Sequence, residues 1–403
     1  MKKASILFAA AILLSVNAFC QLVRLNSEKS KNALYFDLDR VFNYNLYEHA
    51  RWGGGLRYDI NFSKKRFKTL SFGGYLGYGY EDQRIKWGVR SELYGSSQHR
   101  LRLYTDFIHD LTPDAGRNLL DYSVADFTAT GSFMAWRFSD AYRWTLGMSR
   151  RQSKDLTLSA EGRLSFERRL YDYWGLIYPE NDSVWHELPS AFFSEARFCL
   201  SYKEKWSTEI LLGTRIDNPM LVARLLSQYD NTLLFSFFKL HLFAQAGITP
   251  ENTPYSRMFD LGGSWGSPLY FQRSLVTARH NEFTANVFSM VAMRLTTRKP
   301  LFDLYSELFQ IGTNPVPFVM LNAAWGRLWN EDVDGLKIHN ALILMSPTKG
   351  IAEVGAGING LLRFGNIDWG GMVAYRLSPA NAFYHFSDPK DNLSWLVTAS
   401  LHL

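Results

Sequence analysis

Apolar and polar residues alternate with a period of two along much of this chain. In residues 155–169 the charged residues Glu161 and Arg163 fall on one side of the pattern, and the other side holds Leu156, Leu158, Ala160, Gly162, Leu164 and Phe166. A helical period would scatter these leucines around the helix axis, whereas successive side chains of a strand point to opposite faces. The alternation therefore predicts a β-strand.

The same alternation predicts strands near residues 33–44, 51–62, 68–80, 84–95, 99–110, 141–151, 192–203, 205–216, 232–247, 257–264, 281–297, 301–312, 316–328, 337–346, 350–362, 366–377 and 394–403. Many of these segments are longer than the strands of soluble proteins and match the length that a tilted strand needs to cross a bilayer. Two stretches, 111–133 and 171–190, look like loops, and the second is either an ordered surface loop or a plug. Because bacterial single-chain barrels have even strand numbers, we expect an all-β, transmembrane antiparallel β-barrel of about sixteen strands.

The segment RIKWGVRSEL, residues 84–93, shows the two faces of such a strand, one apolar and one charged. On its own, the segment would also suit a half-buried strand of a soluble sheet, with the charged side in water. In a barrel the apolar side faces lipid and the charged side faces the lumen. We therefore expect six lipid-facing residues, Ile85, Trp87, Val89, Leu93, Leu156 and Leu158, and six lumen-facing residues, Arg84, Lys86, Arg90, Glu92, Glu161 and Arg163.

The N-terminus has the pattern of an export signal. Lys2 and Lys3 precede an apolar stretch, Ile6 to Val16, which is followed by Ala18-Phe19-Cys20. This is typical of a cleaved signal peptide and too short for a comfortable membrane span. Lipidation of Cys20 is the weaker alternative, because the bulky Phe19 stands where a small residue is usual. We expect a signal peptide at 1–20 and one barrel domain at 21–403, in the outer membrane of a Gram-negative cell.

Composition narrows the class of protein. Phe, Tyr and Trp make up 15% of the residues, mean hydropathy is slightly negative, and no run of 18 apolar residues follows the leader. A helical membrane protein is therefore excluded, whereas aromatic girdles around a polar interior suit an outer-membrane barrel. The last ten residues, SWLVTASLHL, alternate up to the end, which resembles the C-terminal signal of such barrels.

Charge gives no sign of a nucleic-acid partner. Outside the leader, 42 Lys and Arg stand against 38 Asp and Glu, a net charge of +4, and both signs are interspersed. A basic patch or stripe, which nucleic-acid binding requires, is missing from the sequence.

Catalytic and metal-binding patterns are also missing. The nine histidines are scattered without metal-ligand spacing, and the sequence has no nucleophile-elbow or phosphate-loop motif. Cys199, the one cysteine after the leader, falls on the polar side of its segment. Glu161 and Arg163 look like a catalytic cluster only until the same polar alternation is seen elsewhere. We expect no enzyme activity, no catalytic residue, no metal site and no cofactor.

Three segments resemble, in the right order, a Bacteroidetes family of outer-membrane barrels of unknown function that is related to the BamA/TamA-type assembly superfamily. These segments are 42–88, 271–302 and 349–377. Members often carry an N-terminal carboxypeptidase-regulatory-like domain, and here we expect the barrel only. The residues that match the family motifs are Asn45, Glu48, Arg51, Gly79, Asp82, Glu353, Gly357, Asp368 and Arg376.

The resemblance implies a non-enzymatic, assembly-factor-like barrel. Such a protein would act in envelope biogenesis, in transport, or as the barrel partner of another envelope protein. Its expected partners are outer-membrane lipid and a separately encoded periplasmic or envelope protein. The alternatives are a passive porin-like channel, an outer-membrane lipase or esterase, and a soluble exported β-sandwich.

Overall fold

The computed structural model of the chain describes residues 23–26, 32–37, 42–45, 48–62, 67–95, 101–113, 138–170, 190–203, 205–217, 219–261, 275–278, 283–306, 311–331, 336–339, 342–364, 367–377 and 392–401. The expected signal peptide at 1–20 lies outside these residues. Of the two expected loops, residues 111–113 instead continue a strand, and Ser190 alone is described of 171–190. Within the described ranges, no helix has the length and hydrophobicity that membrane crossing requires.

Strands make up nearly all of the described structure, and the one other element is the short 3-10 helix η5 (Tyr255–Arg257). The strands are β1 (Val23–Asn26), β2 (Ala33–Asp37), β3 (Phe42–Asn45), β4 (His49–Asn61), β5 (Phe67–Gly79), β6 (Ile85–Gly95), β7 (Leu101–Pro113), β8 (Phe138–Arg151), β9 (Leu156–Leu170), β10 (Ala191–Tyr202), β11 (Trp206–Arg215), β12 (Met220–Leu234), β13 (Phe238–Ile248), β14 (Phe259–Asp260), β15 (Thr284–Ala285), β16 (Val287–Thr297), β17 (Leu304–Ser306), β18 (Ile311–Thr313), β19 (Val316–Arg327), β20 (Leu336–His339), β21 (Leu342–Met345), β22 (Ile351–Phe364), β23 (Ile367–Arg376) and β24 (Leu393–Leu401).

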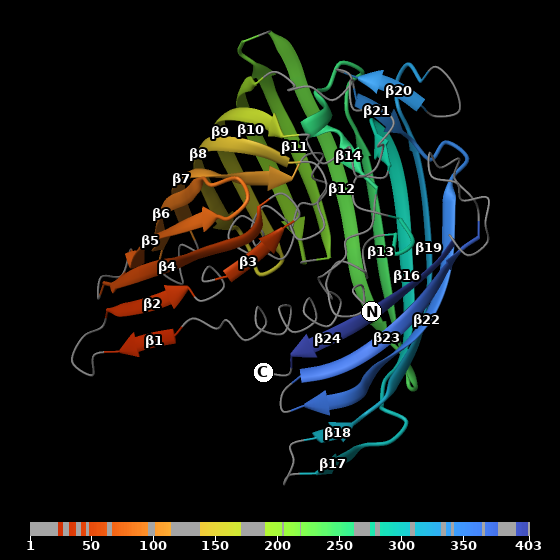
Figure 1. Ribbon diagram of the computed structural model, residues 1–403. Helices are drawn as coiled ribbons and strands as arrows, with labels where there is room; N and C mark the ends of the chain where they lie inside the picture. The colour runs from red at the N-terminus through yellow and green to blue at the C-terminus, as the bar shows by residue number, and fades with distance from the viewer. Residues whose placement is uncertain are drawn as a thin grey trace. The chain divides into compact units, whose positions relative to one another are not determined.

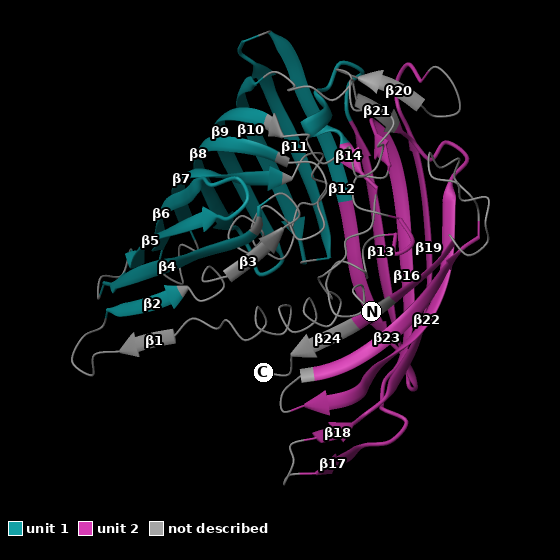
Figure 2. Cartoon of the chain, in the orientation of Figure 1, with its two compact units in different colours: residues 1–227, 249–258, 338–342 teal, residues 228–248, 259–337, 343–403 magenta. Residues whose placement is uncertain are grey.

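The chain divides into two compact units, which Figure 2 colours separately. Unit 1 contains residues 1–227, 249–258 and 338–342, and unit 2 contains 228–248, 259–337 and 343–403.

Unit 1 is an antiparallel sheet in which strands β4 to β11 follow one another in chain order (Figure 1). At its N-terminal side, β2 pairs with residues 55–59 of β4, and β3 pairs with residues 49–52 of the same strand. Strands β2 and β3 are therefore one strand with an interruption. The four-residue strand β1 pairs with β2.

Unit 2 is also antiparallel, with β13, β16, β19, β22, β23 and β24 in that order. The small hairpin of β17 and β18 joins this sheet at the end of β22 (Figure 1). Strands β14 and β15 form a separate pair, as do β20 and β21.

The predicted strand number is confirmed. Twenty strand segments take part in the main antiparallel pairing of the described residues. When β1 and the β17–β18 hairpin are set aside and β2 and β3 are counted as one strand, sixteen remain. The expected all-β antiparallel class is confirmed by the same pairing.

One expected strand was placed wrongly. The segment 232–247 was expected to be a single strand, but the structure has the end of β12, a turn at residues 235–237 and then β13. Phe235 and Phe237 in this turn are apolar and exposed. Ser236 is the one polar residue of this turn, and its place between Phe235 and Phe237 continues the alternation of a strand. For that reason the sequence pattern did not show the turn, and the expected strand left most of β12 out.

Three other segments expected to be long strands are short hairpin elements instead. In the described part of these segments, residues 257–261 include the two-residue β14, residues 301–306 and 311–312 include β17 and part of β18, and residues 337–339 and 342–346 include most of β20 and β21. Each lies in a connection between two long strands. Short hairpins alternate in the same way as long strands, so periodicity alone does not separate the two.

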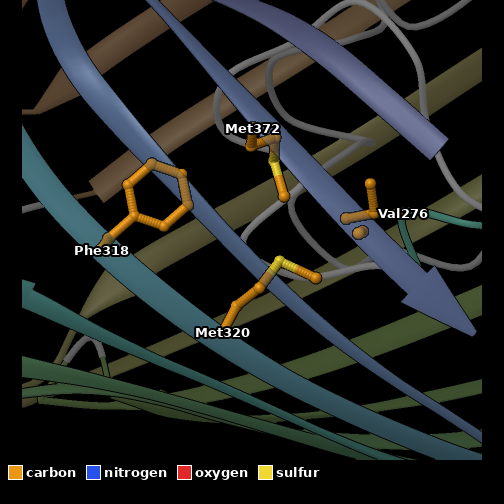
Figure 3. Packing of buried hydrophobic residues seen from close by; sticks show 5 residues of the cluster. Val276, Phe318, Met320 and Met372 are labelled. Carbon is orange, nitrogen blue, oxygen red and sulfur yellow. The ribbon is translucent and has the colours of Figure 1, made fainter. Parts of the chain in front are cut away.

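Buried apolar side chains form small clusters on the face of each sheet that also carries the buried charged residues. In unit 1, Phe193 and Val222 belong to such a cluster with Ala191 and Leu211. In unit 2, Val276, Phe318, Met320 and Met372 lie together with Ala374 (Figure 3). The opposite face of the strands is largely apolar and exposed. This distribution is the reverse of a soluble sheet and is typical of a membrane barrel.

Candidate functional site

Strand β6 shows the two faces most clearly. Ile85 and Val89 are each 53% exposed, whereas Lys86 and Glu92, on the alternate face of the strand, are buried. Trp87 and Leu93 are half-buried on the side of Ile85, and the Trp87 ring contacts the edge of Phe107 on β7. The structure thus separates the apolar and charged residues as the sequence pattern predicts. That these faces meet lipid and lumen remains a prediction.

Arg84, which precedes β6, and Arg90 and Glu92 of β6 are paired. Arg84 binds Asp140 at 2.9 Å and Arg90 binds Glu92 at 2.5 Å. Arg102 on β7 also binds Glu92, at 2.7 Å, and the Tyr94 hydroxyl donates to the same carboxylate.

Strand β9 has the same arrangement. Leu158 is exposed and Leu156 is half-buried, while Glu161 and Arg163 lie on the other face and bind each other at 2.8 Å. Glu161 also accepts a hydrogen bond from the Tyr104 hydroxyl at 2.7 Å. Cys199 of β10 stands opposite Ser159 of β9 in the same row of polar residues.

The first group of family-like residues comes together in unit 1. Arg51 binds the carboxylate of Glu48 at 2.7 Å and that of Asp110 at 2.7 Å. Gly79 lies against Glu48 and Asp82, and a Cβ atom at this glycine would stand 2.2 Å from an oxygen of Asp82. Glycine is therefore required for the close approach. The side chain of Asn45 lies outside the described residues.

Lys86 joins this group and is fully buried. Its ammonium nitrogen lies 2.7 Å from Asp82, 4.0 Å from Glu48 and 3.9 Å from Asp140. Asp140 also binds the His109 ring at 2.9 Å. Because an unpaired buried charge is very costly, the three carboxylates are what permits a lysine at this position.

In unit 2, Glu353 and Arg376 hold a segment of the long connection between β13 and β16. One oxygen of Glu353 accepts from the backbone N–H of Val276 at 2.7 Å, and the other accepts from the N–H of Thr277 at 2.8 Å and its hydroxyl at 2.6 Å. Arg376, opposite Glu353 in the register, donates to the Thr277 carbonyl at 2.7 Å. Asn322 donates to Glu353 at 2.6 Å.

The two remaining family-like residues lie elsewhere in unit 2. Gly357 lies beneath the ring of Phe318, whose Cζ atom would be 2.5 Å from an added Cβ. Asp368 is buried and binds Arg363 at 2.6 Å. The matched residues therefore do not form one site.

The strongest anchor in unit 1 was missed by sequence reasoning. Arg257, in the connection after β13, donates to Glu167 of β9 at 2.7 Å and to Glu195 of β10 at 2.6 Å. Its guanidinium also lies 4.3 Å from the centre of the Phe193 ring. Residues 253–258 are all buried. The sequence signal was slight, because Glu167 and Glu195 are 90 and 62 residues away along the chain.

Electrostatics keep Arg257 charged. Burial alone would lower its pKa, but the carboxylates of Glu167 and Glu195 raise that pKa well above its ordinary value. The cluster is thus a fixed ion triad with one positive and two negative partners.

These contacts fix parts of the connection between β13 and β16 against the charged face of the sheet. Residues 253–258 are held in unit 1 through Arg257, and residues 275–278 are held in unit 2 through Glu353 and Arg376. No group of His, Cys, Asp and Glu in the described part of the chain has the geometry to hold a metal ion. The arrangement is suited to anchoring a segment.

No family model matches the chain, and no curated protein matches it in sequence. Solved structures match its fold. BamA from Haemophilus ducreyi, in a form lacking POTRA domains 1–3, gives a TM-score of 0.53 at 9% identity over 99% of this chain and 79% of its own. CdiB from Escherichia coli gives 0.51 at 11% identity over 94% of this chain and 67% of its own.

A third structure, CdiB from Acinetobacter baumannii, has a TM-score of 0.46, and the chain spans only 63% of its length. The first two likenesses show the fold, an antiparallel β-barrel like those of BamA and CdiB. The barrel fold expected from the sequence is thereby confirmed.

Proposed function

We propose that this protein is a non-enzymatic outer-membrane barrel of the assembly-factor-like type. It acts in envelope biogenesis or transport, or as the barrel partner of another envelope protein. The observation that carries the proposal is the connection between β13 and β16, whose residues 253–258 and 275–278 cover the charged face of the sheet and are held there by buried ions. A connection held against this face narrows the space inside the barrel, which favours this proposal over a wide open channel.

The family resemblance supports the same proposal. Glu353 and Arg376, matched to the family by sequence, are the residues that hold Thr277. Membership of the Bacteroidetes family, export by cleavage after residue 20, and a separately encoded periplasmic or envelope partner belong to this proposal. Outer-membrane lipid is its second partner.

The charged residues support a structural role over a catalytic one. Glu161 is bound by Arg163 and Tyr104, and Lys86 is surrounded by carboxylates. A general acid or base must be free to reach a substrate, and residues neutralised in this way are poorly placed to do so.

The competing function is a passive pore, and single-channel recording separates the two. We expect the purified full chain in a planar bilayer to give no large, steady conductance steps. The double variant Arg257→Ala with Glu353→Gln, which removes both anchors, should give more frequent openings. Large and steady steps from the unaltered chain would overturn the proposal in favour of the pore.

A further inference from the structure

The connection between β16 and β19, residues 298–315, is unusual for its end of the sheet. The turn 235–237 between β12 and β13, at the same end of unit 2, has only three residues. Residues 298–315 instead contain the hairpin of β17 and β18.

This hairpin extends the sheet of unit 2 beyond Val316, the first residue of β19. The pairing of β19 with β22 ends at Val316 and Asn359, and β22 continues to Phe364. Over this continuation β18 takes the place of β19, with Ile311 opposite Phe364 and Gly312 opposite Arg363. We call β17, β18 and residues 361–364 of β22 the apolar flap.

The outer face of the apolar flap is hydrophobic and exposed. Leu304 is 63% exposed, and Ile311 and Phe364, adjacent to each other in the register, are also exposed. The inner face is different in kind. Tyr305 stands opposite Gly312, which stands opposite Arg363, and Arg363 binds the buried Asp368 at 2.6 Å.

The outer face continues onto the neighbouring strand. Leu362 of β22 is exposed and stands opposite the half-buried Trp369 of β23. Further along the same face, Val373 is opposite Trp395, and both are exposed.

The outer face of the apolar flap also holds Thr313 and Ser306, opposite Leu304 and Ile311, and its inner face also holds the exposed Leu361. The flap therefore has a mainly apolar outer face and a mainly polar inner face, less strictly divided than the two faces of β6.

We propose that the apolar flap extends the barrel wall into the outer layer of the membrane, with its outer face against phospholipid acyl chains near the headgroups, where water can bind the backbone groups at the edge of β17. A soluble partner would be expected to meet a polar rim around the apolar residues, whereas this face runs directly into the apolar face of β23 and β24. At the start of the connection, the exposed Lys299 carries the charge that lipid phosphates attract, whereas Arg298 donates to the carbonyl of Phe235 at 3.0 Å. The proposal requires only that the chain crosses a membrane, and it holds for an assembly factor and a pore alike.

Spin labels test the proposal directly. In the full chain, serine first replaces Cys20 and Cys199. One cysteine is then introduced for the spin label, as Leu304→Cys, Ile311→Cys or Phe364→Cys. Each labelled variant is reconstituted into phospholipid vesicles. Labels at these positions should collide with oxygen, which partitions into lipid, several-fold more than with a water-soluble nickel chelate. Val89→Cys provides the comparison on a membrane-crossing strand.

Tyr305→Cys and Lys154→Cys are the matched controls, the first on the other face of the same hairpin and the second in the exposed turn after β8. Both should favour the nickel chelate. Labels at 304 and 311 that behave like Lys154→Cys would place the flap in water and overturn the proposal. Protection from both reagents would mean that a protein or a second copy covers the flap, which also overturns it. Each variant counts only if its gel mobility changes on heating as that of the parent does.

Discussion

A single arginine does the most to hold the connection in unit 1. Arg257 is buried with Glu167 and Glu195, and removing one partner of a buried ion cluster leaves the others uncompensated. The sequence alone could not identify this triad. The tertiary fold brings its members together. A single arginine in a connection belongs to no alternating pattern of residues, so periodicity could not point to it.

We expect Arg257→Ala to lower the free energy of unfolding by about 3–5 kcal/mol, because two buried carboxylates lose their counter-ion. Urea unfolding of the bilayer-inserted protein measures the change. Arg215→Ala is the control, since Arg215 binds Asp217 in an exposed turn, where a surface pair contributes about 0–1 kcal/mol. Equal losses in the two variants would show that the Arg257 triad is not a buried anchor.

Two glycines give a second test at the scale of the residue. At Gly357 a methyl group would meet the ring of Phe318 and the backbone carbonyl of Gly371, whereas at Gly54 nothing lies within 4 Å. We expect Gly357→Ala to cost about 1–3 kcal/mol as an overpacked site and Gly54→Ala to be tolerated. The same unfolding measurement compares them, and a tolerated Gly357→Ala would contradict the packing of Phe318 over this position.

At the scale of the element, periodicity predicted most long strands well because each has one apolar and one polar face. Strand β6 begins at Ile85, one residue from the predicted start, and separates Val89 from Lys86 as expected. Periodicity failed at 232–247, because the turn between β12 and β13 is aromatic and the alternation continues through it. Periodicity also could not tell the β17–β18 hairpin from a strand that crosses the membrane. The two alternate in the same way, and the length of a strand depends on the strand with which it pairs.

The outer face of β6 supplies a prediction at this scale. Val89→Arg should destabilise the inserted protein by about 2–4 kcal/mol if residue 89 is near the bilayer midplane. Tyr80→Arg, at an exposed residue after the end of β5, should cost about 0–1 kcal/mol, as expected near an interface. Full tolerance of arginine at 89 would contradict the assignment of this face to lipid.

The hold of β22 on the connection is tested by Glu353→Gln. The neutral amide loses the charge that accepts from the N–H groups of Val276 and Thr277. A hydrogen bond to a charged group contributes about 1.5–3 kcal/mol, so exchange of these two amide protons should become roughly tenfold to a hundredfold faster. Asp368→Asn, which removes a buried carboxylate bound to Arg363 instead, should leave their exchange unchanged. Equal exchange in the two variants would mean that Glu353 does not hold the segment.

For the whole molecule, the sequence was enough to predict the all-β class, the strand number and the barrel fold, because all three depend on one repeated pattern. It could not predict how the connection between β13 and β16 is held, which depends on residues from β9, β10, β22 and β23. The cleaved leader and the single domain at 21–403 remain predictions.

The central claim is that the chain crosses the outer membrane as a barrel, with residues such as Ile85 and Val89 in lipid. Membrane fractionation followed by gel electrophoresis tests it most directly. We predict that the protein stays in the membrane pellet through a carbonate wash, and that its mobility in detergent gels shifts when the sample is heated. Release by carbonate without detergent, together with a mobility that heating does not change, would contradict the claim.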